Sequence, residues 1–499
     1  MNLLKQSLRG PAVWLFLLLL AAYAYFFPRW ADWGQNSKLD LTMAIVDQGT
    51  FVIDDYYQNT GDYALYQGKH YSDKAPGTSF LGVPFYALFK GLASTSLVDN
   101  LINRLANNPA MNATLREDGS GLLYDKVYQA MALYVVTFFT VSLPSAFLGA
   151  LLYVFLGDFI PNRRIRILAV LLYGLGTVAF PYAQTLNGRQ IAAVLHITSF
   201  YLLFRMRRKE LATRWLWLVG LLMGYAFITD YPSVFILAAL FFYAVLGLRD
   251  SDSARFNVAD LRKFIPFVVA GALPVLLMMF YNYRCFDTVL PVGYKYSALY
   301  QDVHSQGLIS ITAPHWEAIY GLTFSPFRGM FYLSPALLLA IPGFVYWFRK
   351  NSLRAEFWVV LWSVGITFLF YGSSVMWWGG FAVGPAYLAA MIPMLAFPFA
   401  YFLDRHAGHA WVQALAVALV VLSIALIWAE TIAGQSFPDM TPNPLWRISL
   451  PALAGGDIAR NLGMILKLQG PASLLPLAVV MVALLAVIFR QAGQADSQR

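Results

Sequence analysis

The sequence predicts an all-α polytopic membrane protein with about 12 transmembrane helices, and three observations support this fold class. Apolar side chains make up 59% of the 499 residues and charged ones only 12%, a composition outside the range of soluble globular proteins. Apolar runs of membrane-spanning length recur along the chain. Aromatic residues reach 16%, as expected where tryptophan and tyrosine line both membrane interfaces.

The apolar runs define the expected spans. They are 11–27, 127–157, 167–186, 190–204, 215–229, 232–248, 264–283, 331–348, 357–374, 385–403, 411–430 and 472–489. The fourth run is short for the ~17 residues that a spanning helix usually needs. The first run follows Lys5 and Arg9 as in a signal peptide, but no small-residue cleavage site follows it, so we expect it to remain as an anchor.

The distribution of charge predicts the topology. With both termini in the cytoplasm, the basic clusters at 163–166, 205–209, 249–263 and 349–350 all face the cytoplasm, as the positive-inside rule requires. The net charge of +9 is then a consequence of topology, and a nucleic-acid partner is not expected. The apolar run 78–92 would reverse this arrangement if it crossed the membrane. We therefore expect it to be an amphipathic helix on the outer surface.

The chain is expected to form a single membrane-embedded domain, 1–499, with three long segments on the outer face. These are the first loop, 28–126, and the later loops 284–330 and 434–471. The segments expected on the cytoplasmic side are shorter. A protein with most of its non-membrane mass on the outer face is expected to work there.

Periodicity and turn residues predict the layout of the first loop. A helix is expected near 37–47, ended by Gly49, and followed by an extended stretch, Thr50–Asp55. The turn at Pro76-Gly77 precedes a second helix, for which Thr78 is the expected N-cap.

The acidic residues of the first loop are the strongest chemical signal. In an extended stretch, Asp54 and Asp55 would point to opposite faces, so one could enter a cavity while the other stays in water. His70, Asp73 and Lys74 come just before the Pro76-Gly77 turn, where a helix N-terminus beside a lysine would form an anion site. The alternatives are that these acids are simply solvated and that Lys74 is an interfacial lysine.

The later outer loops place basic residues among aromatic rings. Lys295 and Tyr296 lie in one loop, Arg328 follows Ser325-Pro-Phe, and Trp378 belongs to a Trp-Trp-Gly-Gly sequence. Such residues serve as interfacial anchors, or they bind a lipid phosphate and stack on a sugar ring, and the sequence does not separate the two uses. No cysteine or histidine spacing typical of a metal site occurs, and the single Cys285 excludes an intramolecular disulfide.

Four stretches carry a resemblance to a known family: LTMAIVDQGTFVID (41–54), NTGDYALYQGKHYSDKAPG (59–77), SPFRGMFYLSP (325–335) and WWGGFAVGPAYL (377–388). With them the chain resembles bacterial membrane glycosyltransferases of the C-type fold, which are related to protein O-mannosyltransferases and to lipid A aminoarabinose transferases. The resemblance implies a polyprenyl-phosphate-linked sugar as donor and a glycan, lipid or protein acceptor. It also implies an active site on the periplasmic side of the bacterial inner membrane and a role in cell envelope glycan synthesis.

The resemblance implies an inverting transfer in which a first-loop carboxylate takes the proton of the acceptor hydroxyl and cations hold the departing lipid phosphate. The candidate bases are Asp40, Asp54 and Asp73. The candidate phosphate- and donor-binding residues are Lys74, Arg328, His70, Lys295 and Tyr296, and those lining the substrate are Asn36, Asn59, Asp62, Tyr71 and Trp378. No divalent metal is indicated.

The sequence departs from the family in two places, and two other functions stay open. Asn36-Ser37 stand where better-known members have Asp-Glu, and Ala386 stands where similar proteins often have arginine. A transporter or flippase of a lipid-linked sugar is the first alternative, although no internal repeat is evident. The second is an assembly protein of the same fold that has lost its catalytic base.

Overall fold

A computed structural model describes residues 10–29, 32–112, 124–248, 262–290, 292–299, 310–434 and 441–496. Lys5, Arg9 and most of the basic segment 249–263 lie outside the described residues, as do parts of the expected outer loops 284–330 and 434–471.

The regular structure is almost entirely helical. The N-terminal part forms α2 (Pro11–Ala24), α3 (Trp33–Gln48), η1 (Tyr57–Asn59), β1 (Tyr63–Tyr66), β2 (Lys69–Ser72), α4 (Gly77–Ala93), α5 (Ser96–Ala106) and α6 (Pro109–Asn112). The middle part forms α7 (Tyr124–Thr137), η2 (Phe138–Ser142), α8 (Leu143–Leu156), α9 (Arg163–Leu175), α10 (Ala179–Tyr182), α11 (Gly188–Arg207), η3 (Thr213–Trp215), α12 (Leu216–Thr229), α13 (Ser233–Gly247), α15 (Ile265–Phe286) and η4 (Gly293–Tyr296). The C-terminal part forms α17 (Trp316–Thr323), α18 (Met330–Leu333), η5 (Pro335–Leu339), α19 (Ala340–Lys350), α20 (Arg354–Gly372), η6 (Ala386–Leu395), α21 (Ala396–Arg405), α22 (Ala410–Ile432), η7 (Leu445–Ser449), α23 (Leu450–Ala454), α24 (Leu462–Ile465), η8 (Gly470–Leu474) and α25 (Leu475–Asp496).

Within the described residues, six helical segments are long and apolar enough to cross a membrane. They are Lys126–Leu156, Ile265–Phe286, Arg354–Gly372, Ala386–Arg405, Ala410–Ile432 and Gly470–Gly493. The pair α4 and α5, which meet at an angle of 92°, would make a seventh candidate. The predicted number of about 12 transmembrane helices is therefore not confirmed. Several of the expected spans are short or broken helices: 167–186, for example, is divided into α9 and α10.

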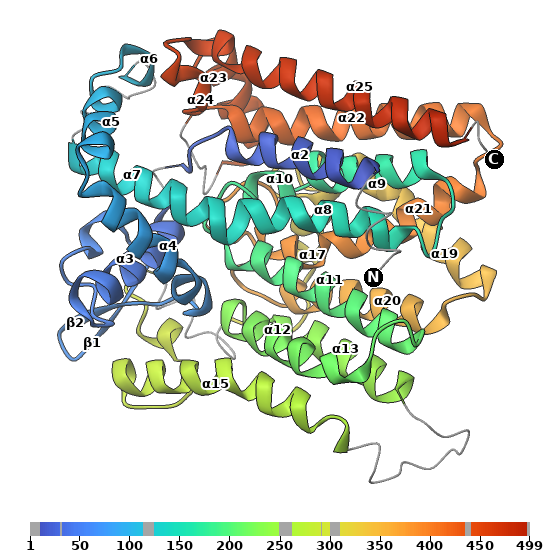
Figure 1. The fold of residues 1–499 in the computed structure, drawn as a ribbon, viewed down its shortest axis with the longest axis horizontal. Helices are drawn as coiled ribbons and strands as arrows, with labels where there is room; N and C mark the ends of the chain where they lie inside the picture. Colours follow the sequence, from blue (N-terminus) through green and yellow to red (C-terminus); the bar gives the residue numbers. More distant parts are fainter. Residues whose placement is uncertain are drawn as a thin grey trace.

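The helices pack into a layered bundle with the first loop gathered at one end. Figure 1 shows α22 and α25 along one side, α15 along the opposite side, and α3 to α6 with the β-hairpin at the end away from the C-terminus. The span Ala386–Arg405 is central, with 89% of its apolar window buried, whereas Ile265–Phe286 and Gly470–Gly493 are only 22% and 17% buried. Outer helices that expose apolar side chains are typical of a protein surrounded by lipid, so the chain is a multi-pass membrane protein.

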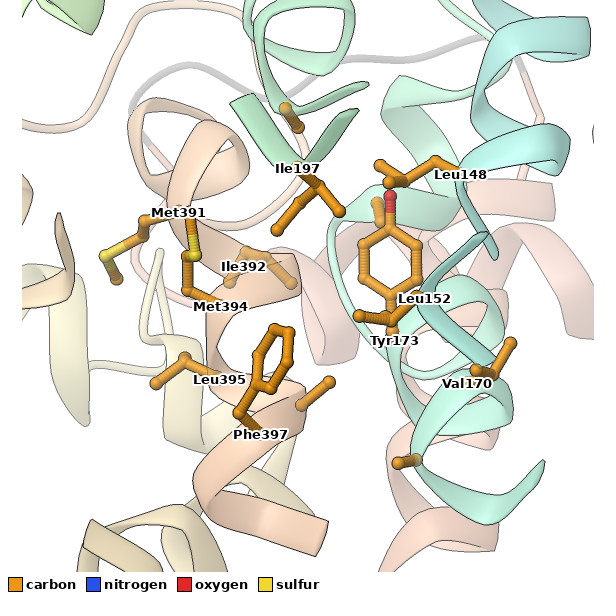
Figure 2. Packing of buried hydrophobic residues seen from close by; sticks show 14 of the residues in the cluster. Leu148, Leu152, Val170, Tyr173, Ile197, Met391, Ile392, Met394, Leu395 and Phe397 are labelled. Carbon is orange, nitrogen blue, oxygen red and sulfur yellow. The ribbon is translucent and has the colours of Figure 1, made fainter. Parts of the chain in front are cut away.

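Interlocking apolar side chains fill the centre of the bundle. Figure 2 shows Leu148 and Leu152 of α8, Val170 and Tyr173 of α9, and Ile197 of α11 facing the segment 391–397. Leu148, Leu152 and Ile197 are fully buried. This core fixes the positions of the helix ends against which the first loop packs.

The first-loop helix forms as its sequence predicts and begins earlier. Asp32 is the N-cap of α3, and its side chain accepts a hydrogen bond from the backbone N–H of Gln35 at 3.2 Å. Gly49 ends the helix in the left-handed conformation, at φ 67°, which confirms the predicted stop. β1 and β2 then pair in antiparallel register, Tyr63 with Ser72, around a turn in which Gln67 and Gly68 both have positive φ.

The prediction of an extended stretch over Thr50–Asp55 is wrong. The backbone N–H groups of Tyr56 and Tyr57 both donate to the carbonyl of Ile53 at 2.9 Å, so the chain turns there and has no strand alternation. Asp54 and Asp55 are consequently both exposed, and neither enters a cavity. The helix α4 begins at Gly77, and its N-cap is Pro76 rather than Thr78.

Candidate functional site

A group of charged side chains gathers where the first loop meets the ends of the bundle helices. Its members, which we call the charged cluster, are Asp32 and Lys38 of α3, Asp62 before β1, Asp73 and Lys74 after β2, Arg189 of α11 and Asp230 after α12. The tyrosines 294, 371 and 387 border it. Segments from both halves of the chain therefore contribute to one site.

The start of α3 brings two carboxylates and a lysine around Gly34. A Cβ atom placed on Gly34 would lie 3.4 Å from a carboxylate oxygen of both Asp32 and Asp62, and 3.7 Å from the Nζ of Lys38. Lys38 lies one helical turn after Gly34 and donates to its carbonyl at 2.5 Å. A side chain at position 34 would fill the space in which these three groups converge.

Lys74 joins the hairpin to a later part of the chain. Its Nζ lies 3.0 Å from Asp62 Oδ2 and 3.2 Å from Asp73 Oδ1. The hydroxyl of Ser297 donates to Asp73 Oδ2 at 2.9 Å, and Lys74 lies 5.8 Å from the centre of the Tyr294 ring. The ammonium group is thus held between two carboxylates, and one of these is fixed by the segment that follows η4.

Arg189 extends the cluster to the bundle. It belongs to the first turn of α11, whose N-cap Asn187 accepts a hydrogen bond from the Arg189 backbone N–H at 2.9 Å. Its Nε lies 3.8 Å from Asp230 Oδ1, and its guanidinium lies 4.2 Å from the centre of the Tyr387 ring. Tyr387 in turn stacks on Tyr371 at 4.5 Å, so two aromatic rings support the guanidinium from one side.

Burial shifts the pKa values of the cluster residues that belong to the first loop. Burial raises the pKa of Asp32 to about 6, a rise that the nearby Lys38 opposes. Burial lowers the pKa of Lys38 to about 8, and the positive charge of Lys74 lowers it further. Burial alone would also lower the pKa of Lys74, but the carboxylates of Asp62 and Asp73 outweigh it and hold that pKa above its usual value. Near neutral pH the cluster therefore combines protonated lysines with a carboxylate that can accept a proton.

Of the residues predicted from sequence, Asp73, Lys74 and Asp62 belong to the cluster. Asn36, Asn59 and Asp40 form an adjoining contact: Asn36 Nδ2 donates to the Asn59 carbonyl, and Asn59 Nδ2 donates to Asp40 Oδ1, both at 2.9 Å. Asp40 is fully buried on α3, and burial raises its pKa well above its usual value. These contacts attach the segment preceding Asp62 to α3.

The predicted residues Asp54 and His70 lie apart from the cluster. Asp54 is 47% exposed, and its Oδ1 lies 2.8 Å from His70 Nδ1. The His70 ring stacks on Tyr57 at 3.7 Å. Asp54 and His70 therefore form a surface pair on the outside of the hairpin.

Tyr71, Lys295 and Tyr296 also take up positions outside the cluster. Tyr71 and Tyr296 pack against Phe286, at ring distances of 5.4 Å and 5.6 Å, in the apolar contact between the hairpin and the end of α15. Lys295 is exposed beside Tyr296.

Arg328 is fully buried within the bundle. It donates to the carbonyl of Gly380 at 3.0 Å, and its guanidinium lies 4.3 Å from the Phe327 ring. It interacts electrostatically with Glu430, whose backbone carbonyl accepts a hydrogen bond from Arg29 at 2.6 Å. Trp378 packs edge-on against Trp377 at 6.1 Å.

Four members of the cluster are not among the site residues predicted from the sequence: Asp32, Lys38, Arg189 and Asp230. Asp32 could have been predicted from the sequence, because an aspartate just before a helix is a typical N-cap. Arg189 and Asp230 are charges at the edges of apolar runs, and such charges are commonly functional in membrane proteins. Their pairing depends on α11 and α12 lying side by side, which the sequence does not show.

Among the described residues, no group of three His, Cys, Asp or Glu side chains has the arrangement of a metal site.

No protein-family model matches the sequence, and no curated protein matches it. The structure is similar to that of ArnT from Cupriavidus metallidurans bound to undecaprenyl phosphate, with 15% sequence identity and a TM-score of 0.47, over 96% of this chain and 73% of that chain. It is also similar to ArnT from the same organism in the apo state, with 14% identity and a TM-score of 0.48, over 95% and 74% of the two chains.

Proposed function

We propose that the protein transfers a glycosyl residue from a polyprenyl-phosphate-linked sugar to an acceptor hydroxyl at the periplasmic face of the bacterial inner membrane. One observation carries the proposal: a carboxylate of raised pKa, Asp32, lies near Lys38 and Lys74 of the charged cluster, at the junction of a polar loop with an apolar bundle. The resemblance of the first-loop sequence to C-type glycosyltransferases supports the same reaction.

The reaction requires two kinds of group. A lipid phosphate is already a good leaving group, so an inverting transfer needs one base to remove the acceptor proton and cations to stabilise the phosphate as it departs. We assign the base to Asp32, because a pKa of about 6 leaves it ionised at neutral pH and close to the pH at which proton transfer is efficient. Lys38, Lys74 and Arg189 are the proposed phosphate-binding residues.

Asp62 and Asp73 then serve to hold Lys74. Both contact its ammonium group, and Asp73 is anchored by Ser297, so the lysine is held in place before a donor arrives. Such preorganisation reduces the cost of reorganising charge during the reaction. Asp54 and Asp40, the other bases suggested by the sequence, contact His70 and Asn59 rather than a lysine or arginine of the cluster.

The test uses the purified full-length protein with undecaprenyl-phosphate sugars as donors and a membrane extract as the source of acceptor. Release of undecaprenyl phosphate is measured. Asp32→Asn is expected to lower the rate at least about 100-fold, the usual contribution of a general base. Asp55→Asn, which removes an exposed carboxylate of the same loop, is the matched control and should keep the full rate.

Full activity of Asp32→Asn would reject Asp32 as the base. Binding of donor by the wild type without any release of undecaprenyl phosphate would instead favour one of the non-catalytic alternatives, a transporter or an assembly protein.

A further inference from the structure

A second polar site lies at the other end of α11. A pocket of about 340 Å³ opens between the last turn of α11 and the first turn of α20. It is lined by Phe204, Arg207, Arg208, Leu353, Arg354, Ala355 and Glu356. The charged cluster is at the start of α11, and a helix of 20 residues is about 30 Å long. The apolar layer of a membrane is also about 30 Å thick, so the length of α11 separates the two sites by about one membrane thickness.

The lining of this pocket is positively charged. Arg207, Arg208 and Arg354 face a single carboxylate, Glu356, which already accepts a hydrogen bond from the hydroxyl of Tyr243 at 2.6 Å. Guanidinium groups bind phosphate through paired hydrogen bonds, so three of them around one pocket favour a phosphate-bearing ligand.

Contacts with neighbouring side chains hold the guanidinium groups in place. That of Arg207 lies 5.1 Å from the ring of Tyr243, and that of Arg208 contacts Asp158 Oδ1 at 3.1 Å. Asp158 also binds Arg205, which pairs in turn with Glu210 at 2.5 Å. Together with Arg207, Arg354 and Glu356, these side chains comprise four arginines and three carboxylates. The lining therefore keeps an excess of positive charge.

The surroundings of the pocket indicate an amphipathic ligand. Arg354 lies 6.0 Å from the ring of Phe348, which is 48% exposed. Trp358 follows Arg354 by one helical turn, lies on the same side of α20 and is 56% exposed. Exposed rings beside arginines are typical of the membrane interface, where a headgroup lies in the polar site and acyl chains lie along the rings.

The positive-inside rule explains why these arginines are expected on the cytoplasmic side of the membrane. It does not explain why they lie together around one pocket. Arg207 and Arg354 come from segments that are far apart in the sequence, and tertiary packing brings them to one pocket. Like charges brought together repel each other unless an anion lies between them. Basic pockets between membrane helices on the cytoplasmic side are a recognised form of lipid headgroup site.

We propose that this pocket binds the phosphate of an anionic membrane phospholipid. The site is separate from the charged cluster and does not depend on the proposed glycosyl transfer.

The experiment measures lipid binding to the full-length protein by native mass spectrometry, with dioleoyl phosphatidylglycerol and dioleoyl phosphatidylcholine as probes. The wild type is expected to bind phosphatidylglycerol more tightly than phosphatidylcholine. Arg207→Gln/Arg354→Gln should weaken phosphatidylglycerol binding at least about tenfold, because two guanidinium groups that would contact the lipid phosphate are lost. Arg349→Gln removes an exposed arginine that does not line the pocket, and it should leave binding unchanged.

Three results would overturn the proposal: equal binding of the two lipids, wild-type affinity in the double variant, or an equal loss in the Arg349→Gln control. Complete displacement of phosphatidylglycerol by millimolar inorganic phosphate would also overturn it, in favour of a soluble anion. If the double variant fails to fold, the single variants replace it. Arg354→Gln should then lose affinity and Arg354→Lys should keep most of it, with thermal unfolding as the check on folding.

Discussion

At the scale of single residues, Lys74 links the hairpin, the segment before it and the segment after η4. Its ammonium group contacts Asp62 and Asp73, and the Asp73 side chain is only 1% exposed. Removing one partner of a buried ion pair leaves the other charge without compensation, which typically costs roughly 3–5 kcal/mol. Lys74 is itself 19% exposed, so the lower end of that range applies.

Lys74→Met should therefore lower the free energy of unfolding by about 3 kcal/mol. It should also abolish the proposed donor binding, because the departing phosphate loses a cation. Thermal unfolding in detergent and transfer assays measure the two effects. Lys69→Met, at an exposed position of the same hairpin, should change neither. Wild-type stability in Lys74→Met would show that the ion pair contributes little.

Because of Asp32, both the stability of the protein and its transfer rate are expected to depend on pH. The sign of each effect follows from the raised pKa of this carboxyl group. Its pKa is about 6 in the folded protein against an ordinary value of 3.8. Between about pH 4 and pH 6 the native state binds more protons than the unfolded state, so the contribution of Asp32 to stability falls as pH rises. Catalysis by ionised Asp32 should change in the opposite direction and increase as pH rises through about 6.

The measurement is the thermal unfolding temperature and the transfer rate of the wild type and of Asp32→Asn between pH 4.5 and 8. Asp32→Asn should remove the rise in rate near pH 6 and flatten the corresponding part of the stability profile. Asp55→Asn should retain both profiles. A wild-type rate that does not change between pH 5 and pH 7 would contradict the assignment of the base.

At the scale of elements, small residues allow three helix ends to meet beside the charged cluster. A Cβ on Gly77, at the start of α4, would lie 2.5 Å from Thr229 Oγ1 and 2.8 Å from the backbone of Ile228. A Cβ on Gly188, at the start of α11, would lie 2.5 Å from the carbonyl of Thr229. The close approach of α4, α11 and α12 thus depends on the absence of side chains at these two glycines.

Gly77→Ala should destabilise the protein by about 1–3 kcal/mol, because the added methyl group meets backbone atoms that cannot move aside without displacing α12. Gly91→Ala is the control on the same helix, where a Cβ meets nothing within 4 Å and alanine favours the helix. The two variants are compared by thermal unfolding. Equal unfolding temperatures would mean that the contact between α4 and α12 relaxes at little cost.

At the scale of the whole molecule, the charged cluster and the arginine-lined pocket occupy opposite ends of α11. The hairpin and α3 lie at one end of the bundle, away from the C-terminus (Figure 1). The charge distribution predicts that the hairpin end faces the outer side of the membrane and that the arginine-lined end faces the cytoplasm.

This topology can be tested with introduced cysteines, since Cys285, the one cysteine in the sequence, is buried. In a Cys285→Ser background, Lys69→Cys on the hairpin should react with a membrane-impermeant maleimide in intact cells. Lys209→Cys, just after α11, should react only after the cells are permeabilised. Both positions are exposed, so the reverse labelling pattern would reject the proposed location of the active site.

The sequence by itself determined the membrane class, the helix α3 with its stop at Gly49, and three members of the charged cluster, Asp62, Asp73 and Lys74. These features are local. Hydropathy, a glycine at a helix end and a run of polar residues before a turn depend on neighbouring residues in the chain, so a pattern in the sequence is sufficient to show them.

Only the tertiary structure decided which charges meet. Arg189 and Asp230 join Lys74 because α11 and α12 end where the first loop packs, and no local pattern encodes that juxtaposition. The tertiary structure also showed Asp54 and Asp55 exposed on a turn, where hydrogen bonds to Ile53 take the place of strand pairing. Long-range packing sets burial, and burial sets both the pKa of a carboxylate and its access to a site, so these properties could not be obtained from the order of residues alone.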